Sequence, residues 1–152
     1  MEIKRRMVFT GYFIIALFLA GNGTVYLLAD RIMPYHLAAM GTTWDAMTAG
    51  MQVMTLSFMK SAAAGFLTTA AAIIFLLLIP FRRKENWANW ALLIISLNEL
   101  CLLISRIAAI RAKTPARPPI LPFLILAGDA LVCFAILQSS TKKERKENDR
   151  LR

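Results

Sequence analysis

Four long apolar runs constrain the fold of this chain more than any other feature. They cover residues 7–28, 61–79, 87–106 and 120–138. Each is close to the roughly 20 residues that a helix needs to cross a bilayer core of about 30 Å. Hydrophobic residues make up 58% of the chain, more than in a typical soluble domain. The sequence therefore predicts an all-α integral membrane four-helix bundle and leaves little chain for a soluble catalytic domain.

The segments between the runs set the expected boundaries of a single four-span domain over residues 1–152. Thr43 before Trp44 and Asp45 is typical of a helix N-cap with an acid in the first turn, so we expect the second helix to begin close to Trp44. Pro80 is expected to end that helix. The predicted helices cover residues 7–28, 46–79, 87–108 and 120–139, with an outer loop at 29–45 and a basic tail at 140–152.

The net charge of +9 comes from cations at the ends of the apolar runs, a placement that argues against nucleic-acid binding. The cations that would share one side of a four-span protein are Lys4, Arg5, Arg6, Arg82, Arg83, Lys84, Lys142, Lys143, Arg145, Lys146, Arg150 and Arg152. By the positive-inside rule, this asymmetry places both termini in the cytoplasm. The sequence thus predicts a multi-pass protein of a bacterial inner membrane, with the lipid bilayer as its first partner.

Two acids, Glu99 and Asp129, lie inside the third and fourth apolar runs. A carboxylate at membrane depth costs roughly 2.5–3.5 kcal/mol on an insertion scale, so it requires a partner, a water-filled cavity or a proton. Counted from the outer ends of their helices, both acids lie about 10–13 Å deep, and we expect them at one level. The other polar candidates near this level or at its mouth are Asn98, Asn22, Arg106, Lys60 and His36.

Two interpretations of the acids are open. In the functional one, Glu99 and Asp129 line a small cavity that opens outward, where they carry protons or bind a cationic ligand. Two acids this close would not both ionise easily. In the structural one, Glu99 pairs with Arg106 or Lys60. Asp129 then bonds to Asn22 or a threonine, and these contacts fix the helix register.

Methionines gather in the outer loop and at the start of the second helix. Met47, Met51 and Met54 have i, i+4, i+7 spacing and are predicted to share a helical face. Thioethers beside His36 would suit Cu(I), whereas methionine also packs adaptable apolar surfaces, so they are only weak metal candidates and no cofactor is expected. His36 is either an acid–base group at the cavity mouth or an interfacial side chain beside Tyr35.

Three segments carry a family resemblance: Arg31-Ile-Met-Pro-Tyr-His36, Ile79-Pro-Phe-Arg-Arg83 and Lys113-Thr-Pro-Ala-Arg-Pro-Pro119. Together they resemble an uncharacterised family of small bacterial four-span membrane proteins over most of the chain. The resemblance implies fold and location and transfers no catalytic residue. The four-span size is also similar to the DoxX-like and emopamil-binding-protein-like groups, and the latter would imply intramembrane acids near a ligand amine. The small multidrug resistance family differs, because its essential glutamate lies in the first helix.

These observations favour a membrane protein that is not an enzyme. We expect it to bind a small molecule or lipid in an outward-facing polar pocket, or to support a membrane-protein partner. The alternative is a subunit of an oligomeric proton-coupled transporter, because one four-helix unit encloses little space. A membrane enzyme ranks third, since the sequence has no phosphate loop, zinc motif or nucleophile with a base at fixed spacing.

Overall fold

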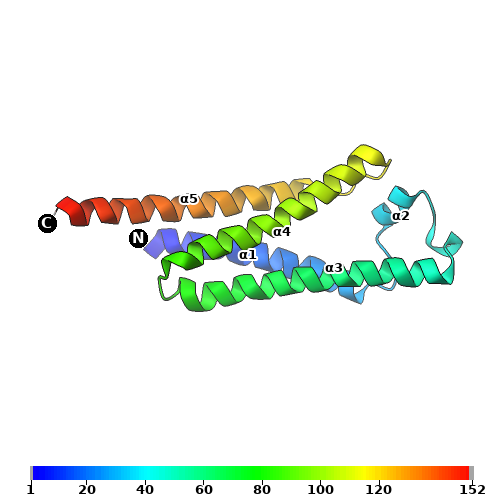
Figure 1. The fold of residues 1–152 in the computed structure, drawn as a ribbon, viewed down its shortest axis with the longest axis horizontal. Helices are drawn as coiled ribbons and strands as arrows, with labels where there is room; N and C mark the ends of the chain where they lie inside the picture. Colours follow the sequence, from blue (N-terminus) through cyan, green and yellow to red (C-terminus); the bar gives the residue numbers. More distant parts are fainter. Residues whose placement is uncertain (1, 151–152) are drawn as a thin grey trace.

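In the described part of the chain, four long helices and three short helical segments form the fold (Figure 1). The computed structural model describes residues 2–150, and side chains are described for residues 2–139. The long helices are α1 (Glu2–Leu28), α3 (Ala49–Leu76), α4 (Asn86–Lys113) and α5 (Leu121–Arg150), and the short ones are α2 (Pro34–Met40), the 3-10 turn η1 (Trp44–Ala46) and the π turn η2 (Leu77–Phe81). The predicted all-α four-helix bundle is confirmed.

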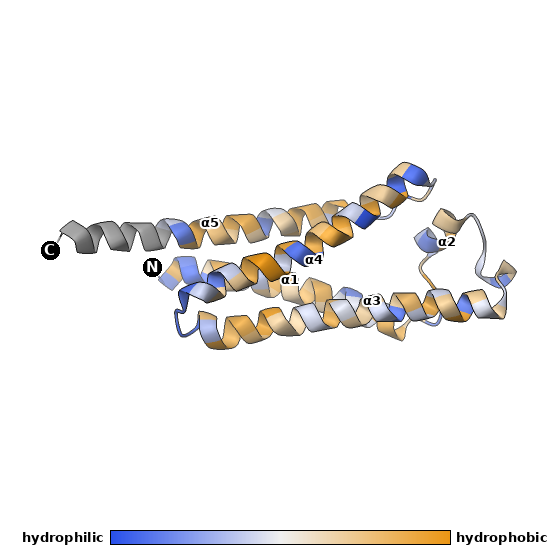
Figure 2. Cartoon of the chain, viewed as in Figure 1, coloured by the Kyte–Doolittle hydropathy of each residue, from blue (hydrophilic) through white to orange (hydrophobic). Residues whose placement is uncertain are grey.

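The long helices have the length and composition of membrane spans. The four candidate spans are Glu2–Leu28, Ala49–Phe81, Asn86–Lys113 and Leu121–Ser139. Figure 2 shows hydrophobic residues along most of the length of each helix. Large apolar side chains such as Leu17, Phe75, Ile94 and Val132 are exposed on the outside of the bundle. Because such a surface is favourable only against an apolar medium, it implies contact with lipid.

The helices pack as a ring in which α1 contacts α3 and α5, and α4 contacts the same two helices. One face of α1 is fully buried through Val8, Tyr12, Ile15 and Leu19, whose three- and four-residue spacing matches the helical repeat. Opposite this face, the buried core residues include Phe66, Ile73, Leu77, Leu92, Leu100 and Ala130. The core therefore lies along the axis of the ring.

The second long helix begins later than predicted. Thr43 precedes only the turn η1, and its side chain makes no capping hydrogen bond. The cap is instead Thr48, whose hydroxyl accepts a hydrogen bond from the Met51 backbone N–H at 3.4 Å. Both threonines have a capping side chain, so the sequence pattern could not choose between them. As a result Met47 lies before α3, and the predicted helical face of three methionines does not form.

The turn after α3 also differs from the prediction. Pro80 does not end the helix, because the chain continues as the π turn η2 through Phe81. Proline lacks an N–H and disrupts the regular i to i−4 bonding, which the wider π turn accommodates. The Arg83 backbone N–H donates to the Ile79 carbonyl at 3.1 Å and helps to close this turn.

The ends of the bundle have different shapes. Both chain ends lie at one end, which we call the N-terminal end (Figure 1). At the opposite end α3 and α4 diverge, and α2 lies beside the opening, so we call this the cap end. Helix α4 runs to Lys113, five residues past its predicted end, and the predicted outer loop contains α2. The basic tail predicted at 140–152 falls outside the residues with described side chains.

Candidate functional site

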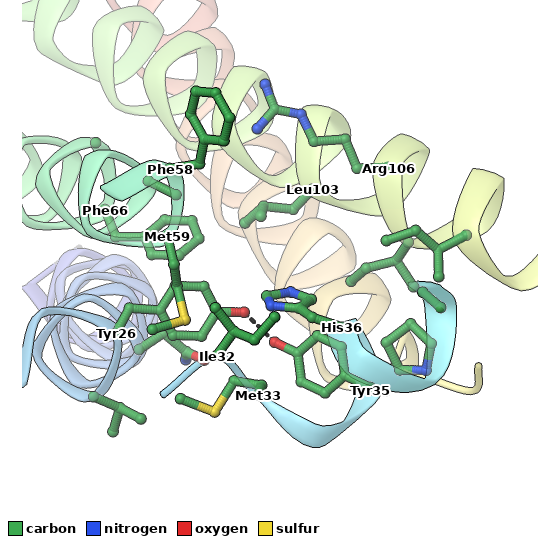
Figure 3. Close-up of a pocket in the computed structure, with 18 of the residues that line it drawn as sticks. Tyr26, Ile32, Met33, Tyr35, His36, Phe58, Met59, Phe66, Leu103 and Arg106 are labelled. Carbon is green, nitrogen blue, oxygen red and sulfur yellow. Dashed lines mark hydrogen bonds between the residues drawn. The ribbon is translucent and has the colours of Figure 1, made fainter. Parts of the chain in front are cut away.

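A cavity of about 940 Å³ lies at the cap end, between the outer parts of α1, α3 and α4 and next to α2 (Figure 3). This size falls within the usual range for small-molecule sites, roughly 300–1,000 Å³. Apolar side chains form most of its wall, among them Ile32, Met59, Phe66, Leu103, Ile107 and Phe123. We call it the outer cavity.

A few polar side chains interrupt the apolar wall of the outer cavity. They are Glu99, Arg106, Asn22, His36, Tyr26, Tyr35, Thr55 and Ser61. Four of the residues singled out from the sequence, namely Glu99, Arg106, Asn22 and His36, thus lie on one cavity. An apolar pocket with a few convergent polar groups is the usual form of a small-molecule site.

Glu99 is the acid of the outer cavity. Its side chain is half-buried, and its Oε2 accepts a long hydrogen bond of 3.5 Å from the Thr69 hydroxyl of α3. Among the described side chains, no cation lies within ion-pair distance of Glu99. A single bond of this length offsets little of the cost of holding a carboxylate away from water. Glu99 is therefore the group in the cavity that most needs a partner.

Arg106 is an exposed cation on the wall of the outer cavity. It follows Glu99 by two helical turns on α4, which corresponds to a rise of about 10 Å toward the cap end. Both side chains line the cavity. In Figure 3 its guanidinium points away from His36. The structural interpretation offered Arg106 as one of two ion-pair partners for Glu99. This ion pair is not formed among the described residues.

Helix α2 closes part of the cavity through an aromatic cluster. Met33 before Pro34 is extended, as expected for a residue that precedes proline, and starts the helix. The hydroxyls of Tyr26 on α1 and Tyr35 on α2 are hydrogen-bonded. The His36 ring packs edge-on against both, with centroid distances of 6.1 Å to Tyr26 and 4.4 Å to Tyr35. These contacts fix α2 over the cavity, although no residue of α2 is fully buried.

Burial in this cluster shifts two titratable groups outside the membrane spans. It lowers the pKa of His36, because the charged imidazolium is disfavoured away from water. Burial and the hydrogen bond with Tyr26 raise the pKa of Tyr35. Both rings are therefore held in their neutral forms near pH 7. His36 contributes a neutral imidazole to the cavity wall and no positive charge.

Asp129 lies elsewhere, at the contact between α1 and α5. Its Oδ1 accepts a weak hydrogen bond of 3.7 Å from the Cys133 thiol one turn further along α5. The backbone of Gly11 on α1 packs directly against both side chains. Asp129 does not line the outer cavity, so the structure separates the two acids that the sequence placed together. At the cap end α4 runs past the start of α5 (Figure 1), so depths counted from the ends of these two helices do not correspond to one level.

The remaining polar candidates also lie outside the cavity lining. Lys60 and Asn98 are both exposed on the surface of the bundle. Asn98 is next to Glu99 in sequence, but adjacent helical residues point about 100° apart and so face different surroundings. Asn22 does line the cavity, and its amide donates to the Phe18 carbonyl of its own helix at 2.8 Å. It holds no bond to Asp129.

The methionines contribute to packing and cavity wall rather than to one face. Met47 is buried, Met51 and Met54 are exposed on α3, and Met59 lines the outer cavity. Within the described residues, no group of three or more His, Cys, Asp or Glu side chains is arranged to hold a metal ion. Because Met47 precedes α3, the three methionines Met47, Met51 and Met54 do not share one helical face.

The aromatic part of the site was not predicted from the sequence. Tyr26 and Phe66 have ring centroids 5.7 Å apart and line the cavity from α1 and α3. Thr69 of α3, whose hydroxyl donates to Glu99, is also absent from the candidates drawn from the sequence. The signal for Tyr26 was its position in the last turn of an apolar helix, which is common to interface tyrosines and so is not specific.

No protein-family model, no curated protein and no solved structure matches this chain. The resemblance to small bacterial four-span proteins therefore stays a prediction.

Proposed function

We propose that this protein binds a compact apolar molecule with a basic group in the outer cavity, without converting it chemically. The observation that carries the proposal is Glu99, a half-buried acid on an apolar cavity that has no cationic partner among the described residues. A ligand amine would supply that partner. The apolar wall would receive the rest of the molecule, because burying apolar surface is worth about 25 cal/mol per Å².

The charge arrangement favours a cation at the inner part of the cavity. Glu99 is the only acid among the lining residues, whereas the one permanent cation, Arg106, lies about 10 Å further along α4 toward the cap end. His36 is neutral near pH 7 and adds no repulsion. A cation in the cavity is therefore attracted by Glu99 and repelled by Arg106, so the Glu99 side of the cavity is the favourable one.

The proposed setting is a bacterial inner membrane with both termini in the cytoplasm. The cations at the N-terminal end support this orientation through the positive-inside rule. The outer cavity would then open on the opposite, outward-facing side. A molecule dissolved in the outer leaflet or in the external medium could reach it without crossing the membrane.

A matched pair of ligands tests the proposal. Adamantylamine and adamantanol share a compact apolar body and differ in the basic group. Thermal unfolding of the purified protein in detergent should show stabilisation by the amine and a much weaker effect of the alcohol. Glu99→Gln should remove the preference for the amine. Asp129→Asn, which also removes a membrane acid but lies outside the cavity, should retain it.

The proposal fails if the amine and the alcohol stabilise the wild type equally, because the carboxylate would then contribute nothing to recognition. It fails as well if Asp129→Asn abolishes the amine preference to the same extent as Glu99→Gln. A screen of other amines of similar size would not rescue it in either case, since Glu99 would not be acting as the counter-ion.

The second candidate is a subunit of an oligomeric proton-coupled transporter. It is favoured by Asn98, a polar side chain exposed on α4 in the middle of a membrane span. Exposed amides in lipid promote helix association, so Asn98 offers a contact for a second copy. In this case vesicles containing the protein should take up a labelled amine only when a proton gradient is imposed. Uptake without a gradient would exclude proton coupling.

A further inference from the structure

A second cavity, of about 590 Å³, lies at the N-terminal end between the start of α1 and the turn that joins α3 to α4. Four cations line it: Arg5 and Arg6 from α1, and Arg82 and Lys84 from the turn. Glu2 is the only acid among its lining residues. We call it the basic cleft. It lies at the opposite end of the bundle from the outer cavity, and nothing about it depends on the proposed function.

Two of the cations are held in place by aromatic rings. The guanidinium of Arg5 donates a hydrogen bond to the Phe81 carbonyl and lies over the Phe81 ring, 4.5 Å from the centroid. The guanidinium of Arg82 lies 6.0 Å from the centroid of Phe9. Cation–π contacts of this kind orient a side chain that would otherwise sample many rotamers. The cleft thus has two partly ordered guanidinium groups before any ligand arrives.

The turn that carries Arg82 and Lys84 is itself well defined. The Glu85 N–H donates to the Pro80 carbonyl at 3.0 Å, and the Lys84 N–H donates to the Phe81 carbonyl at 3.1 Å. This pair of bonds is the Schellman motif, which ends a helix with one left-handed residue. Lys84 is that residue, with φ of 60°. A lysine in a position usually taken by glycine shows that the turn keeps a cation there at some conformational cost.

The positive charge in the cleft is poorly compensated. The described ion pair is between Arg6 and Glu2, with 3.8 Å between Nη2 and Oε2 and both side chains more than four-fifths exposed. Exposed pairs of this kind contribute little. Glu85 accepts a hydrogen bond from the Trp87 indole instead of facing the cleft cations. An anion would therefore meet at least three guanidinium or ammonium groups with free donors.

The basic cleft lies at the level of a membrane interface. Trp87 and Trp90 begin α4 directly after the turn, and both are exposed. Tryptophan at the end of a membrane span is typical of the headgroup region. Phe9 and Phe81 are the large apolar side chains among the residues that line the cleft. The cations consequently lie where phospholipid phosphates are found.

We infer that the basic cleft is a binding site for a phosphate group. Guanidinium groups match phosphate oxygens with paired hydrogen bonds, and lysine adds a point charge. An anionic phospholipid headgroup at the interface is the source that the position of the cleft favours, and a soluble phosphate would be recognised by the same chemistry. Bound phosphate would bridge α1 to the turn between α3 and α4 and so stabilise the N-terminal end.

Thermal unfolding in a neutral detergent at constant ionic strength tests this inference. The ligands are short-chain phosphatidylglycerol, short-chain phosphatidylcholine and inorganic phosphate, each titrated separately. We expect a saturable rise of the unfolding temperature with phosphatidylglycerol and little change with phosphatidylcholine, whose choline offsets the phosphate charge. A comparable saturable rise with inorganic phosphate would support the site and identify a soluble phosphate as its source.

Charge-matched variants separate a built site from general surface charge. Arg6→Gln with Arg82→Gln removes two cleft cations, and we expect half-saturation to require at least about tenfold more ligand. Lys4→Gln with Arg83→Gln removes two exposed cations beside the cleft that do not line it, and should bind almost as the wild type does. Equal weakening in both pairs, or no saturable effect of either phosphate ligand on the wild type, would overturn the inference.

Discussion

Gly11 of α1 lies so close to Cys133 of α5 that a Cβ atom on the glycine would stand 2.5 Å from the Cys133 Sγ. The same Cβ would be 3.0 Å from Oδ2 of Asp129. Beside it, the Tyr12 hydroxyl donates to the Ala130 carbonyl at 3.2 Å. The close crossing of α1 and α5 thus depends on the missing side chain at Gly11, and it holds Asp129 away from the outer cavity.

Gly11→Ala should destabilise the protein by about 1–3 kcal/mol, because the added methyl group overpacks a contact that has no space for it. Thermal unfolding in detergent would measure the effect. Gly21→Ala is the matched control on the same helix, since no atom lies within 4 Å of a Cβ at that position. The control should be neutral or slightly stabilising. Similar losses at both glycines would contradict the proposed crossing.

Tyr35→Phe should loosen α2 while leaving the bundle folded. The change removes the hydrogen bond between the Tyr26 and Tyr35 hydroxyls and keeps the ring contact with His36. A bond of this kind contributes about 1 kcal/mol. Amide hydrogen exchange of residues 34–40 should quicken about fivefold in the variant, with exchange in α1 and α3 unchanged. Unaltered exchange in α2 would show that the hydroxyl pair does not hold it.

The stability of the cap end should fall in mild acid. Burial lowers the pKa of His36 in the folded state below its unfolded value of about 6.5. The unfolded state therefore binds the proton first. Stability is complete above about pH 6.5 and is lost as the pH falls toward the folded pKa. Because His36 is the only histidine of the chain, His36→Gln should flatten the thermal stability profile between about pH 7.5 and about pH 5. A profile unchanged by the substitution would refute this assignment.

Lys84→Gly should stabilise the turn between α3 and α4 by roughly 1 kcal/mol. Glycine adopts the positive φ of 60° found at this position without the steric cost that lysine bears. Thermal unfolding without any phosphate ligand is the appropriate measurement. Lys84→Ala is the control, because it removes the same charge but keeps the Cβ. If both variants have equal stability, the charge of Lys84 rather than its conformation determines the effect.

The sequence predicted the four long helices because runs of about twenty apolar residues have few other stable arrangements. It also identified Glu99, since an acid inside such a run is conspicuous. The start of α3 was misplaced because Thr43 and Thr48 are equally good caps, and only the tertiary structure distinguishes them. Helix α2 was missed because seven residues are too few for a clear periodic pattern.

Sequence spacing alone could not establish whether the side chains of Glu99 and Asp129 lie at the same depth in the bundle. Helix ends are uncertain by several residues, and each residue changes the depth by about 1.5 Å. Rotation about the helix axis also determines which cavity a side chain reaches. In the structure Glu99 faces α3 through Thr69, whereas Asp129 faces α1 at Gly11. Small differences in length and rotation thus placed two similar acids in different surroundings.

The most direct test of the account is the stability of the ligand-free protein with Glu99→Gln. Glu99 is an acid without a cationic partner among the described residues, and we propose that it is kept for a ligand. Thermal unfolding near pH 7 should therefore show a higher unfolding temperature for Glu99→Gln than for the wild type. Asp45→Asn, which removes an exposed acid outside the outer cavity, should leave the unfolding temperature unchanged. A lower unfolding temperature for Glu99→Gln would show that the acid stabilises the fold and would contradict its role as a binding group.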